Sequence, residues 1–487
     1  MSAGCYGQMN GYRVQIFEQD TRPGGLCTSW ERKGYTINGG LAFLGGSGSG
    51  THLYRLWQEL GVVPRIKMID YEYFVIVEGE GEEKFFMHTD LNRLEQHMKG
   101  LAPEDGKVID DFIRAIRIFT KYQLPFEKAQ ELYTAIDKMK LMFTHLPLFR
   151  AIKKWKKVSI QEYVQRFKNP FLRNAFYAIK ASFSDDLPLV VLHLFCAWSH
   201  LKSAGYPEGG SFEFARTIER HFLDLGGRVI YKARADKILV ENNKAVGIRL
   251  EDGSEHYSDH VISAADGRTT LFGMLDRRYV DKKIRGYYET LPLGTPVVLV
   301  ALGISRQFAD LPHSGIGIIY PLKEPATIGG KEFRQLRPMI YNFDPTLAPE
   351  GKTLLRVVLQ ADYDYWKRLH EEGSRYTEEK DRVAEIVINL LEQRFAGISS
   401  EVEMRDVATP VTFERYTGNW KGSIVGWDIT TQTAFMPLPK SLPALQNFWM
   451  AGQWVEPGGG IPVVALSGRN VIQLLTKKDR KPFITKV

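Results

Sequence analysis

Cysteine is scarce in this chain of 487 residues: only Cys5, Cys27 and Cys196 are present. No two of them have the C-x-x-C spacing that is typical of zinc sites and redox pairs. We therefore expect neither a metal site nor a disulfide framework. Three unpaired cysteines also favour a reducing compartment, so the expected location is the cytoplasm.

Long apolar runs are also lacking. A membrane-spanning helix needs roughly 18 consecutive apolar residues, and the best candidates are the shorter runs LPLVVLHLFCAW (187–198) and PVVLVALGI (296–304). The first residues do not combine a basic segment with an apolar one, so no secretory signal is expected. Composition is otherwise ordinary, with 44% hydrophobic and 25% charged residues, and a folded chain of more than one compact unit is expected.

The most informative absence is a glycine-rich turn ahead of the first predicted strand. Residues 13–18, RVQIFE, are typical of a strand that ends in an acid, and Ala3, Gly4 and Gly7 give the preceding helix a face of small residues. In dinucleotide-binding folds the acid follows G-x-G-x-x-G by about 20 residues, which would lie just upstream of Met1. We therefore expect that the first strand and the glycine motif precede the recorded start. The alternative is a different fold.

A glycine pair follows Glu18 in the run QDTRPGGL, and paired glycines let a backbone approach a pyrophosphate closely. This pattern of an acid and then Gly24–Gly25 resembles the FAD-dependent amine oxidase superfamily. The run ERKGYTINGG (31–40) is similar to the branch that holds phytoene desaturases, carotenoid isomerases and retinol saturases. Monoamine oxidases usually have arginine after the pair, so Leu26 favours this branch.

Two later segments support the resemblance. Residues 206–253 are typical of a helix closed by Gly226–Gly227 and followed by strands, and they lead to VISAAD (261–266). Residues 448–475, FWMAGQWVEPGGGIPVVALSGRNVIQLL, resemble the C-terminal flavin motif of the family. The resemblance implies FAD as the cofactor. The residues it assigns to FAD are Glu18, Gly24, Gly25, Leu26, Gly39, Gly40, Ala235, Ala265, Gly452, Gln453, Gly459, Gly460 and Ile461.

The resemblance also implies how these residues act. Glu18 would bind the ribose, the strand at 234–237 would offer backbone groups to the adenine, and the glycines of PGGGIP would face the isoalloxazine and ribityl chain. Gln453 stands where many relatives have aspartate. Its neutral amide is expected to bond a ribityl hydroxyl or a phosphate oxygen.

The predicted fold class is α/β, with a discontinuous Rossmann-like FAD-binding domain whose first strand is missing and an α+β substrate domain. The FAD-binding domain is expected at 1–75, 206–280 and 436–487, and the substrate or cap domain at 76–205 and 281–435. Most of 76–205 is predicted to be helical, with a capping box of Ser159 and Glu162. The second insert is predicted to contain strands at 296–304 and 353–362, and a helix with the apolar stripe Val383, Val387, Leu390 and Leu391.

The net charge of +7 is concentrated in part of the first insert. The stretch KLMFTHLPLFRAIKKWKKVSI (140–160) mixes large apolar residues with Arg150, Lys153, Lys154, Lys156 and Lys157. This composition is typical of a segment that lies on an anionic membrane surface, and a solvated basic helix is an equally good alternative. No nucleic-acid-binding module accompanies the patch, so nucleic acid is not an expected partner.

The favoured function is an FAD-dependent oxidoreductase that acts on a long apolar polyene, a carotenoid or related isoprenoid, by desaturation, saturation or isomerisation. One alternative is a flavin amine oxidase for a smaller polar substrate, with Trp420, Trp427 and Trp454 around the flavin. Another is a truncated flavin-free protein with a binding role. Glu456, beside PGGGIP, is the candidate acid or base, although a structural carboxylate is the commoner role. No catalytic role is assigned to His52, His193, His200 or Cys27.

Overall fold

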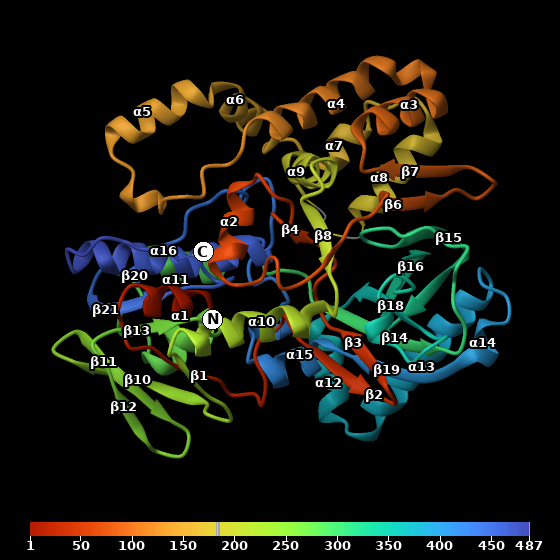
Figure 1. The fold of residues 1–487 in the computed structure, drawn as a ribbon. Helices are drawn as coiled ribbons and strands as arrows, with labels where there is room; N and C mark the ends of the chain where they lie inside the picture. Colours follow the sequence, from red (N-terminus) through yellow and green to blue (C-terminus); the bar gives the residue numbers. More distant parts are fainter. Residues whose placement is uncertain (182, 184–185, 487) are drawn as a thin grey trace.

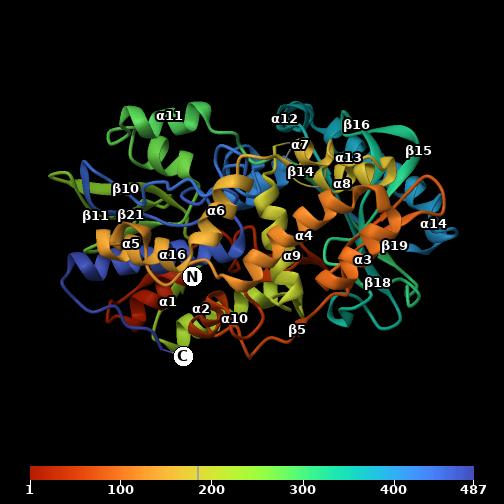
Figure 2. The same ribbon diagram turned by 90° about the horizontal axis from the view of Figure 1, so that it is seen from above.

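The computed structural model describes residues 1–181, 183 and 186–486. Figure 1 shows two halves that contain β-sheet side by side, with a layer of helices above them. The first half surrounds the N-terminus and holds β1, β9 to β13 and β21. The second half holds β14 to β19. Figure 2 gives the same arrangement from above, with α5 on the same side of the molecule as α16.

The first half contains parallel strands in two separate pairs. The strand β1 (Gln15–Phe17) pairs with β9 (Arg228–Ile230), and β13 (Val261–Ser263) pairs with β21 (Leu445–Met450). Among the described residues, no backbone pairing joins β1 to β13. An antiparallel meander of β10 (Ala235–Glu241), β11 (Lys244–Leu250) and β12 (Glu255–Tyr257) adjoins β21. The strand predicted within RVQIFE is confirmed.

Small residues let three helices of this half approach closely. The helix α1 (Ser2–Met9) contacts α10 (Gly210–Asp224) and α16 (Ile461–Lys478). A Cβ added to Gly4 would lie 2.9 Å from the Phe222 ring, and one added to Gly468 would lie 2.6 Å from the Ala3 nitrogen. The face of small residues predicted for α1 is therefore used for close packing. Side chains as small as hydrogen are needed there because real Cβ atoms do not fit.

The second half is built on a four-stranded antiparallel sheet. Its order is β17 (Pro338–Ile340), β18 (Thr353–Gln360), β14 (Val297–Ile304) and β19 (Val402–Ala408). The strand β14 is buried along its whole length, as its run of β-branched and aliphatic residues indicates. The helix α13 (Ser374–Glu392) buries the predicted apolar stripe. The two strands and the helix expected here are confirmed.

Most of the helical layer shares one apolar core. Its members are α3 (Leu91–Leu101), α4 (Gly106–Lys121), α6 (Leu146–Trp155), α7 (Ile160–Val164), α8 (Pro170–Lys180) and α9 (Leu189–His200). The capping box predicted at the start of α7 is present, with Ser159 and Glu162 each bonding the other's backbone N–H. The helix α5 (Ala135–Thr144) belongs to the same layer but has no buried residue.

A hairpin that the sequence did not predict joins the layer to the second half. The strands β6 (Tyr73–Glu78) and β7 (Lys84–His88) form it, and β6 runs parallel to β15 (Ile318–Ile328). No described helix is both long and apolar enough to span a bilayer. The predicted domain boundaries remain a prediction.

Candidate functional site

The acid at the end of β1 lies where the chain returns from β9. The backbone N–H of Glu18 donates to the Ile230 carbonyl, and the Glu18 carbonyl accepts from the Ala233 N–H, both at 2.9 Å. The Glu18 carboxylate accepts a 2.9 Å hydrogen bond from the Asp20 N–H. Burial raises the pKa of Glu18, and the Asp20 amide partly opposes this. A partly buried carboxylate at a strand end is suited to accept hydrogen bonds from sugar hydroxyls.

A hollow of about 670 Å³ adjoins this strand end. Its lining comes from the segment after Glu18, the turn after β9, the end of β11 and the helix α15 (Pro410–Thr417). The members are Gln19, Asp20, Ile230, Tyr231, Lys232, Ala233, Arg234, Leu250, Glu251, Asp252, Arg415 and Tyr416. The predicted residue Ala235 follows Arg234 at the start of β10. The predicted adenine strand therefore begins at the wall of this hollow.

The predicted glycine pair forms a turn that only glycine allows. Gly24 has φ of +113°, and a Cβ there would lie 2.1 Å from the Cys27 carbonyl oxygen. Gly25 has φ of +58°, and a Cβ there would meet open space. Gly25 therefore presents bare backbone at an open surface, which a phosphate or sugar could approach.

The second predicted glycine pair lies against the first. A Cβ added to Gly40 would lie 3.2 Å from the Leu26 carbonyl oxygen, and one added to Gly39 would lie 2.6 Å from the Thr28 carbonyl oxygen. The structure thus brings Gly24, Gly25 and Leu26 together with Gly39 and Gly40, although the two groups are separate in the sequence.

The C-terminal glycines lead into the N-terminus of α16. Gly459 has φ of +50°, and a Cβ there would lie 2.3 Å from the Val425 carbonyl oxygen. Gly460 is the N-cap of α16, is exposed, and has open space where a Cβ would be. Ile461 begins the helix. Pro462 has no N–H, and the Val464 N–H donates to the Gly460 carbonyl at 3.0 Å. The N–H groups of Ile461 and Val463 are therefore those that this 18-residue helix could offer to an electron-rich group.

The end of β13 adjoins the predicted Ala-Gly motif. The Ala451 N–H donates to the Ser263 carbonyl at 2.9 Å, and a Cβ on Gly452 would lie 3.8 Å from the Ala264 carbonyl oxygen. Gly452 has φ of +100° and donates its N–H to Ser467 Oγ at 2.7 Å. Ala265 follows on the exposed side of this junction. The segments that follow the paired strands β13 and β21 thus lie side by side.

Gln453 uses its side chain within the protein. Its Nε2 donates to Asn419 Oδ1 at 2.8 Å, and the indole N–H of Trp454 donates to the same oxygen at 3.1 Å. One amide hydrogen of Gln453 is therefore engaged by Asn419. The expected bond from Gln453 to a ribityl hydroxyl or a phosphate oxygen stays a prediction, and it would use the other amide hydrogen or the amide oxygen.

The three tryptophans proposed for an amine site lie together and contact each other. The ring centroids of Trp427 and Trp454 are 5.1 Å apart, and those of Trp420 and Trp427 are 6.4 Å apart. Tyr288 joins them at 4.9 Å from Trp427. Trp427 and Trp454 are buried. These rings therefore belong to an apolar core, which they share with leucine and valine side chains.

The candidate acid or base Glu456 is held by a buried lysine. Lys440 Nζ lies 3.4 Å from Glu456 Oε1 and 3.3 Å from Glu131 Oε1, and only 7% of the Lys440 side chain is exposed. Burial raises the pKa of Glu456, and the Lys440 ammonium opposes this. Glu456 is thus a member of an ion-pair chain, and a catalytic role for it stays a prediction.

The remaining candidates have structural surroundings. His193 is fully buried in the helical layer, and His200 Nδ1 accepts from the Leu91 N–H at 3.2 Å. His52 begins α2 (His52–Glu59), where its Nδ1 lies 3.3 Å from the Leu124 carbonyl. The Cys27 thiol contacts the Ser211 carbonyl at 3.7 Å, and burial raises its pKa to about 12.

Sequence reasoning missed a buried polar network that fixes the second glycine pair. Asn38 Oδ1 accepts from the Ser211 hydroxyl at 2.6 Å, and Asn38 Nδ2 donates to the Leu41 carbonyl at 2.7 Å. Arg356 Nη1 donates to the Asn38 carbonyl at 2.6 Å. This network holds Gly39 and Gly40 against α10. The asparagine directly before the pair, in I-N-G-G, was the signal that could have pointed to it.

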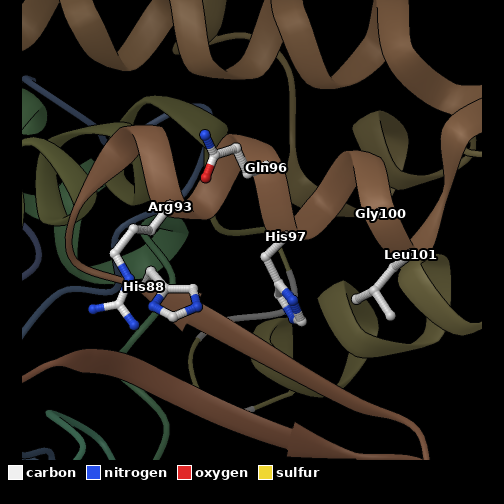
Figure 3. Close-up of a pocket in the computed structure, with 6 residues that line it drawn as sticks. All are labelled: His88, Arg93, Gln96, His97, Gly100 and Leu101. Carbon is white, nitrogen blue, oxygen red and sulfur yellow. The ribbon is translucent and has the colours of Figure 1, made fainter.

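A second hollow, of about 440 Å³, lies apart from these residues between β7 and α3 (Figure 3). It is lined by His88, Arg93, Gln96, His97, Gly100 and Leu101. His97 Nε2 accepts from the Phe86 N–H at 3.0 Å, and Arg93 pairs with Glu72 at 2.9 Å. Two of its polar groups are therefore already engaged within the protein, and we assign it no ligand.

Glu18, the two glycine pairs and the start of α16 each have surroundings that would fit a part of FAD. Glu18 has a partly buried carboxylate that suits a ribose, Gly25 presents bare backbone, and Gly460 leaves open space before the first turn of α16. The turn G-x-G-x-x-G is not found among the described residues. The fit therefore covers the ribose and flavin ends, and the pyrophosphate turn is not part of it.

Comparisons with known proteins agree with this fit. A family model for flavin containing amine oxidoreductase matches residues 1–475. The chain is 23% identical to the prolycopene isomerase of Daucus carota, over 94% of this chain and 75% of that protein. It is 23% identical to the 4,4'-diaponeurosporene oxygenase of Staphylococcus haemolyticus, over 99% of this chain and 96% of that protein.

A solved structure has the same fold. An oxidoreductase from Methanosarcina mazei superposes with a TM-score of 0.62 at 18% identity, and 97% of each chain is covered. This likeness bears on the fold, and the family match bears on the cofactor and the class of chemistry. The protein is an FAD-dependent oxidoreductase with a Rossmann-like fold, and its chain belongs to the flavin-containing amine oxidoreductase family.

Proposed function

We propose that this oxidoreductase acts on a long apolar polyene, a carotenoid or related isoprenoid, by desaturation, saturation or isomerisation. The whole-chain similarity to a prolycopene isomerase and a 4,4'-diaponeurosporene oxygenase supports this substrate class. Bound FAD would accept or return the hydride equivalents. The residues of this chain would hold the cofactor and align the substrate.

The observation that carries the proposal is a group of aromatic side chains around Phe195, of which Trp198 lies nearest the start of α16. We name it the aromatic track and define it as Phe43, Phe183, Phe195 and Trp198. The ring centroid of Phe195 lies 5.2 Å from Phe43, 6.1 Å from Phe183 and 6.2 Å from Trp198. All four rings are only partly buried, so they keep surface for a ligand.

The aromatic track adjoins the proposed flavin end of the site. A Cβ added to Gly45 would lie 2.9 Å from the Trp198 ring and 3.3 Å from Pro462, which is in the first turn of α16. The track members present aromatic faces without charge, which suits a conjugated hydrocarbon better than an ammonium group. Of the tryptophans of the alternative amine site, Trp427 and Trp454 are buried.

We propose that Glu18, Gly24, Gly25, Leu26, Gly39, Gly40, Ala235, Ala265, Gly452, Gln453, Gly459, Gly460 and Ile461 hold FAD. The Glu18→Ala variant should lower FAD affinity by roughly 10- to 100-fold, because a charged acceptor is worth about 1.5–3 kcal/mol. The Glu241→Gln variant changes an exposed acid on the meander and serves as the control. FAD affinity is measured by flavin fluorescence. Equal affinity in the Glu18→Ala variant and the wild type would show that the ribose lies elsewhere.

The substrate is tested with a panel of polyenes of increasing length and a panel of primary amines. Each compound is added to FAD-loaded protein without oxygen, and the flavin absorbance and the polyene spectrum are both followed. We expect the flavin absorbance or the polyene spectrum to change with long polyenes only. The Phe195→Ser variant should show a smaller change. Flavin reduction by amines alone would support the amine oxidase alternative. Protein that takes up no flavin would support the flavin-free alternative.

We also propose that the protein works at an anionic membrane surface, where an apolar polyene would reside. The exposed cations Arg150, Lys153, Lys154 and Lys157, with the half-buried Lys156, support this.

A further inference from the structure

The helix α5 has large apolar side chains that are mostly exposed. We name Ile136, Met139, Met142 and Phe143 the α5 face. Their exposed fractions are 73%, 56%, 57% and 76%. They occupy positions i, i+3, i+6 and i+7, which a helix places on one side. Single exposed apolar residues are ordinary, but a cluster of four large ones on one helix indicates a surface that binds something apolar.

Positive charge surrounds the α5 face. Residues 135–157 contain seven cations, namely Lys138, Lys140, Arg150, Lys153, Lys154, Lys156 and Lys157, and one carboxylate, Asp137. Their net charge is therefore +6, out of +7 for the whole chain. Asp137 is itself paired with Lys128 at 2.7 Å. Almost the whole net charge of the protein thus lies beside its most exposed apolar helix.

The helix α6 directs its cations outward. Leu148, Ala151 and Trp155 are buried in the core of the helical layer. The cations of α6 therefore lie on the remaining face, and Arg150, Lys153 and Lys154 are exposed. The Lys154 ammonium lies 4.1 Å from the centre of the Trp155 ring. The apolar side of α6 packs into the core of the helical layer. Of these two helices, therefore, it is α5 whose large apolar side chains can contact a partner.

We propose that the α5 face inserts into the surface of an anionic lipid bilayer while the α6 cations contact lipid phosphates. An amphipathic segment with this pairing of large apolar groups and lysines binds at the headgroup boundary. A second copy of the chain is a poorer occupant, because two regions of charge +6 would be brought together. This deepens the proposed function, on which it rests, since it names the surface and the helix through which a membrane-dissolved substrate is reached.

The segment before α5 connects this surface to the middle of α16 and, through Lys440, to Glu456. The Glu127 carbonyl accepts from Arg469 Nη1 at 2.6 Å and from Gln473 Nε2 at 2.9 Å, and both residues belong to α16. Glu131 is bound to Lys440, which also binds Glu456. Residues 122–134 thus fasten α5 to α16. Figures 1 and 2 show α5 at the outer end of the helical layer, on the α16 side.

The experiment measures flotation of the full chain with phosphatidylcholine vesicles that contain about 30 mol% phosphatidylserine, and with phosphatidylcholine alone. We expect binding to the first only. Replacing the α5 face in the variant Ile136→Ser/Met139→Ser/Met142→Ser/Phe143→Ser should lower binding by at least about tenfold. The matched control Leu223→Ser/Ile484→Ser changes two exposed apolar residues elsewhere and should bind like the wild type.

A second measurement reports insertion itself. An environment-sensitive dye on Phe143→Cys should shift its emission to the blue on the anionic vesicles, and the same dye on Leu223→Cys should not. Circular dichroism checks that each variant is folded. Equal vesicle binding by the α5-face variant and the wild type would overturn the proposal. A doubled mass in light scattering that the α5-face variant abolishes would overturn it in favour of self-association.

These results are independent of the oxidoreductase proposal. Flotation needs neither FAD nor substrate, so it can succeed where the polyene panel fails. Turnover of a detergent-dispersed polyene does not need the α5 face, so the panel can succeed where flotation fails.

Discussion

Two helices of the same layer, α9 and α5, both carry several large apolar side chains, but α5 also carries charged residues and the two helices have opposite surroundings. α9, LVVLHLFCAWSH, buries most of its twelve residues, whereas α5, AIDKMKLMFT, buries none of its ten. α9 lies against α4 and α6 in the shared core, and α5 contacts α6, its neighbour in the chain. The difference teaches that large apolar side chains on a helix are not by themselves enough for burial. A helix is buried only where another element packs against it. The lysines next to α5 make the apolar core of another protein an unfavourable partner for this helix.

The sharpest test of this difference is truncation of one large side chain in each helix. Leu192 in α9 is fully buried, so the Leu192→Ala variant should lower the free energy of unfolding by about 2–5 kcal/mol. The loss comes from the missing contacts and from the cavity that remains. Urea unfolding followed by circular dichroism measures it. A change below about 0.5 kcal/mol would mean that the surroundings of α9 are not close-packed.

The next effect concerns the one histidine in α9's buried stretch. Neither ring nitrogen of His193 has a hydrogen-bond partner among the described residues, and its ring lies 5.1 Å from Phe112 and 5.3 Å from Trp155. Burial lowers the pKa of His193 from 6.5 to about 3, and Lys154 adds to this. Between these two pKa values His193 is protonated in the unfolded chain and neutral in the folded protein. The free energy of unfolding therefore falls as the pH falls through this range.

The variant His193→Leu should remove that loss. At a pH of about 5 we expect the variant to be more stable than the wild type by about 2 kcal/mol beyond any difference at a pH of about 8. Unfolding free energies at these two pH values give the comparison. A difference that does not change with pH would show that His193 finds a proton acceptor in the folded state.

A smaller effect is expected at the start of α5. Thr134 Oγ1 accepts from the Asp137 N–H at 3.1 Å, and the Asp137 carboxylate accepts from the Thr134 N–H at 2.9 Å. With no buried side chain, this capping box is the main local support of the helix. The variant Thr134→Ala should lower the local stability of α5 by about 1 kcal/mol, seen as faster amide hydrogen exchange in 135–144.

The capping box of α7 provides the matched control. Ser159 is buried beside the core, so Ser159→Ala should lower the global unfolding free energy. Thr134→Ala should leave global unfolding unchanged. Equal global effects from the two variants would show that α5 unfolds together with the rest of the layer.

The smallest effect belongs to truncation of the α5 face in the absence of lipid. Met139→Ala should change the free energy of unfolding by no more than about 0.5 kcal/mol, because the side chain has few contacts to lose. The measurement is the same urea titration as for Leu192→Ala. A loss near that of Leu192→Ala would mean that α5 is covered in solution.

Local sequence patterns predicted much of this fold. The strand in RVQIFE, the fully buried strand β14, the apolar stripe of α13 and the capping box of α7 all depend on neighbours in the sequence. The hairpin β6–β7 is local, since only residues 79–83 join its strands, and it was missed because 76–205 was treated as mostly helical. The pairing of β6 with β15 joins residues that are far apart in the chain and has no local signal. The glycine pairs were recognised from their sequence motif, and the positive φ angles of the first pair explain why glycine is needed.

Asn38 could have been noticed from its place before the glycine pair, but its partners Ser211 and Arg356 could not be predicted, because they come from distant segments. The same limit applies to α5. The sequence around 140–160 indicated either a membrane segment or a solvated helix, and its side chains alone do not reveal whether a partner covers them. Only the fold shows that the α5 face is uncovered.

The crowding of charge into residues 135–157 has a consequence for how the protein travels. The rest of the chain has a net charge of only +1, so the +6 of this segment, which lies at the outer end of the helical layer (Figure 1), contributes an electric dipole to the molecule. An approaching charged plane exerts a torque on such a body before any contact is made, within a distance of about 10 Å at about 0.1 M salt. The protein would therefore reach an anionic membrane with α5 and α6 already oriented towards it. Added salt would screen this interaction and make the orientation on first contact random.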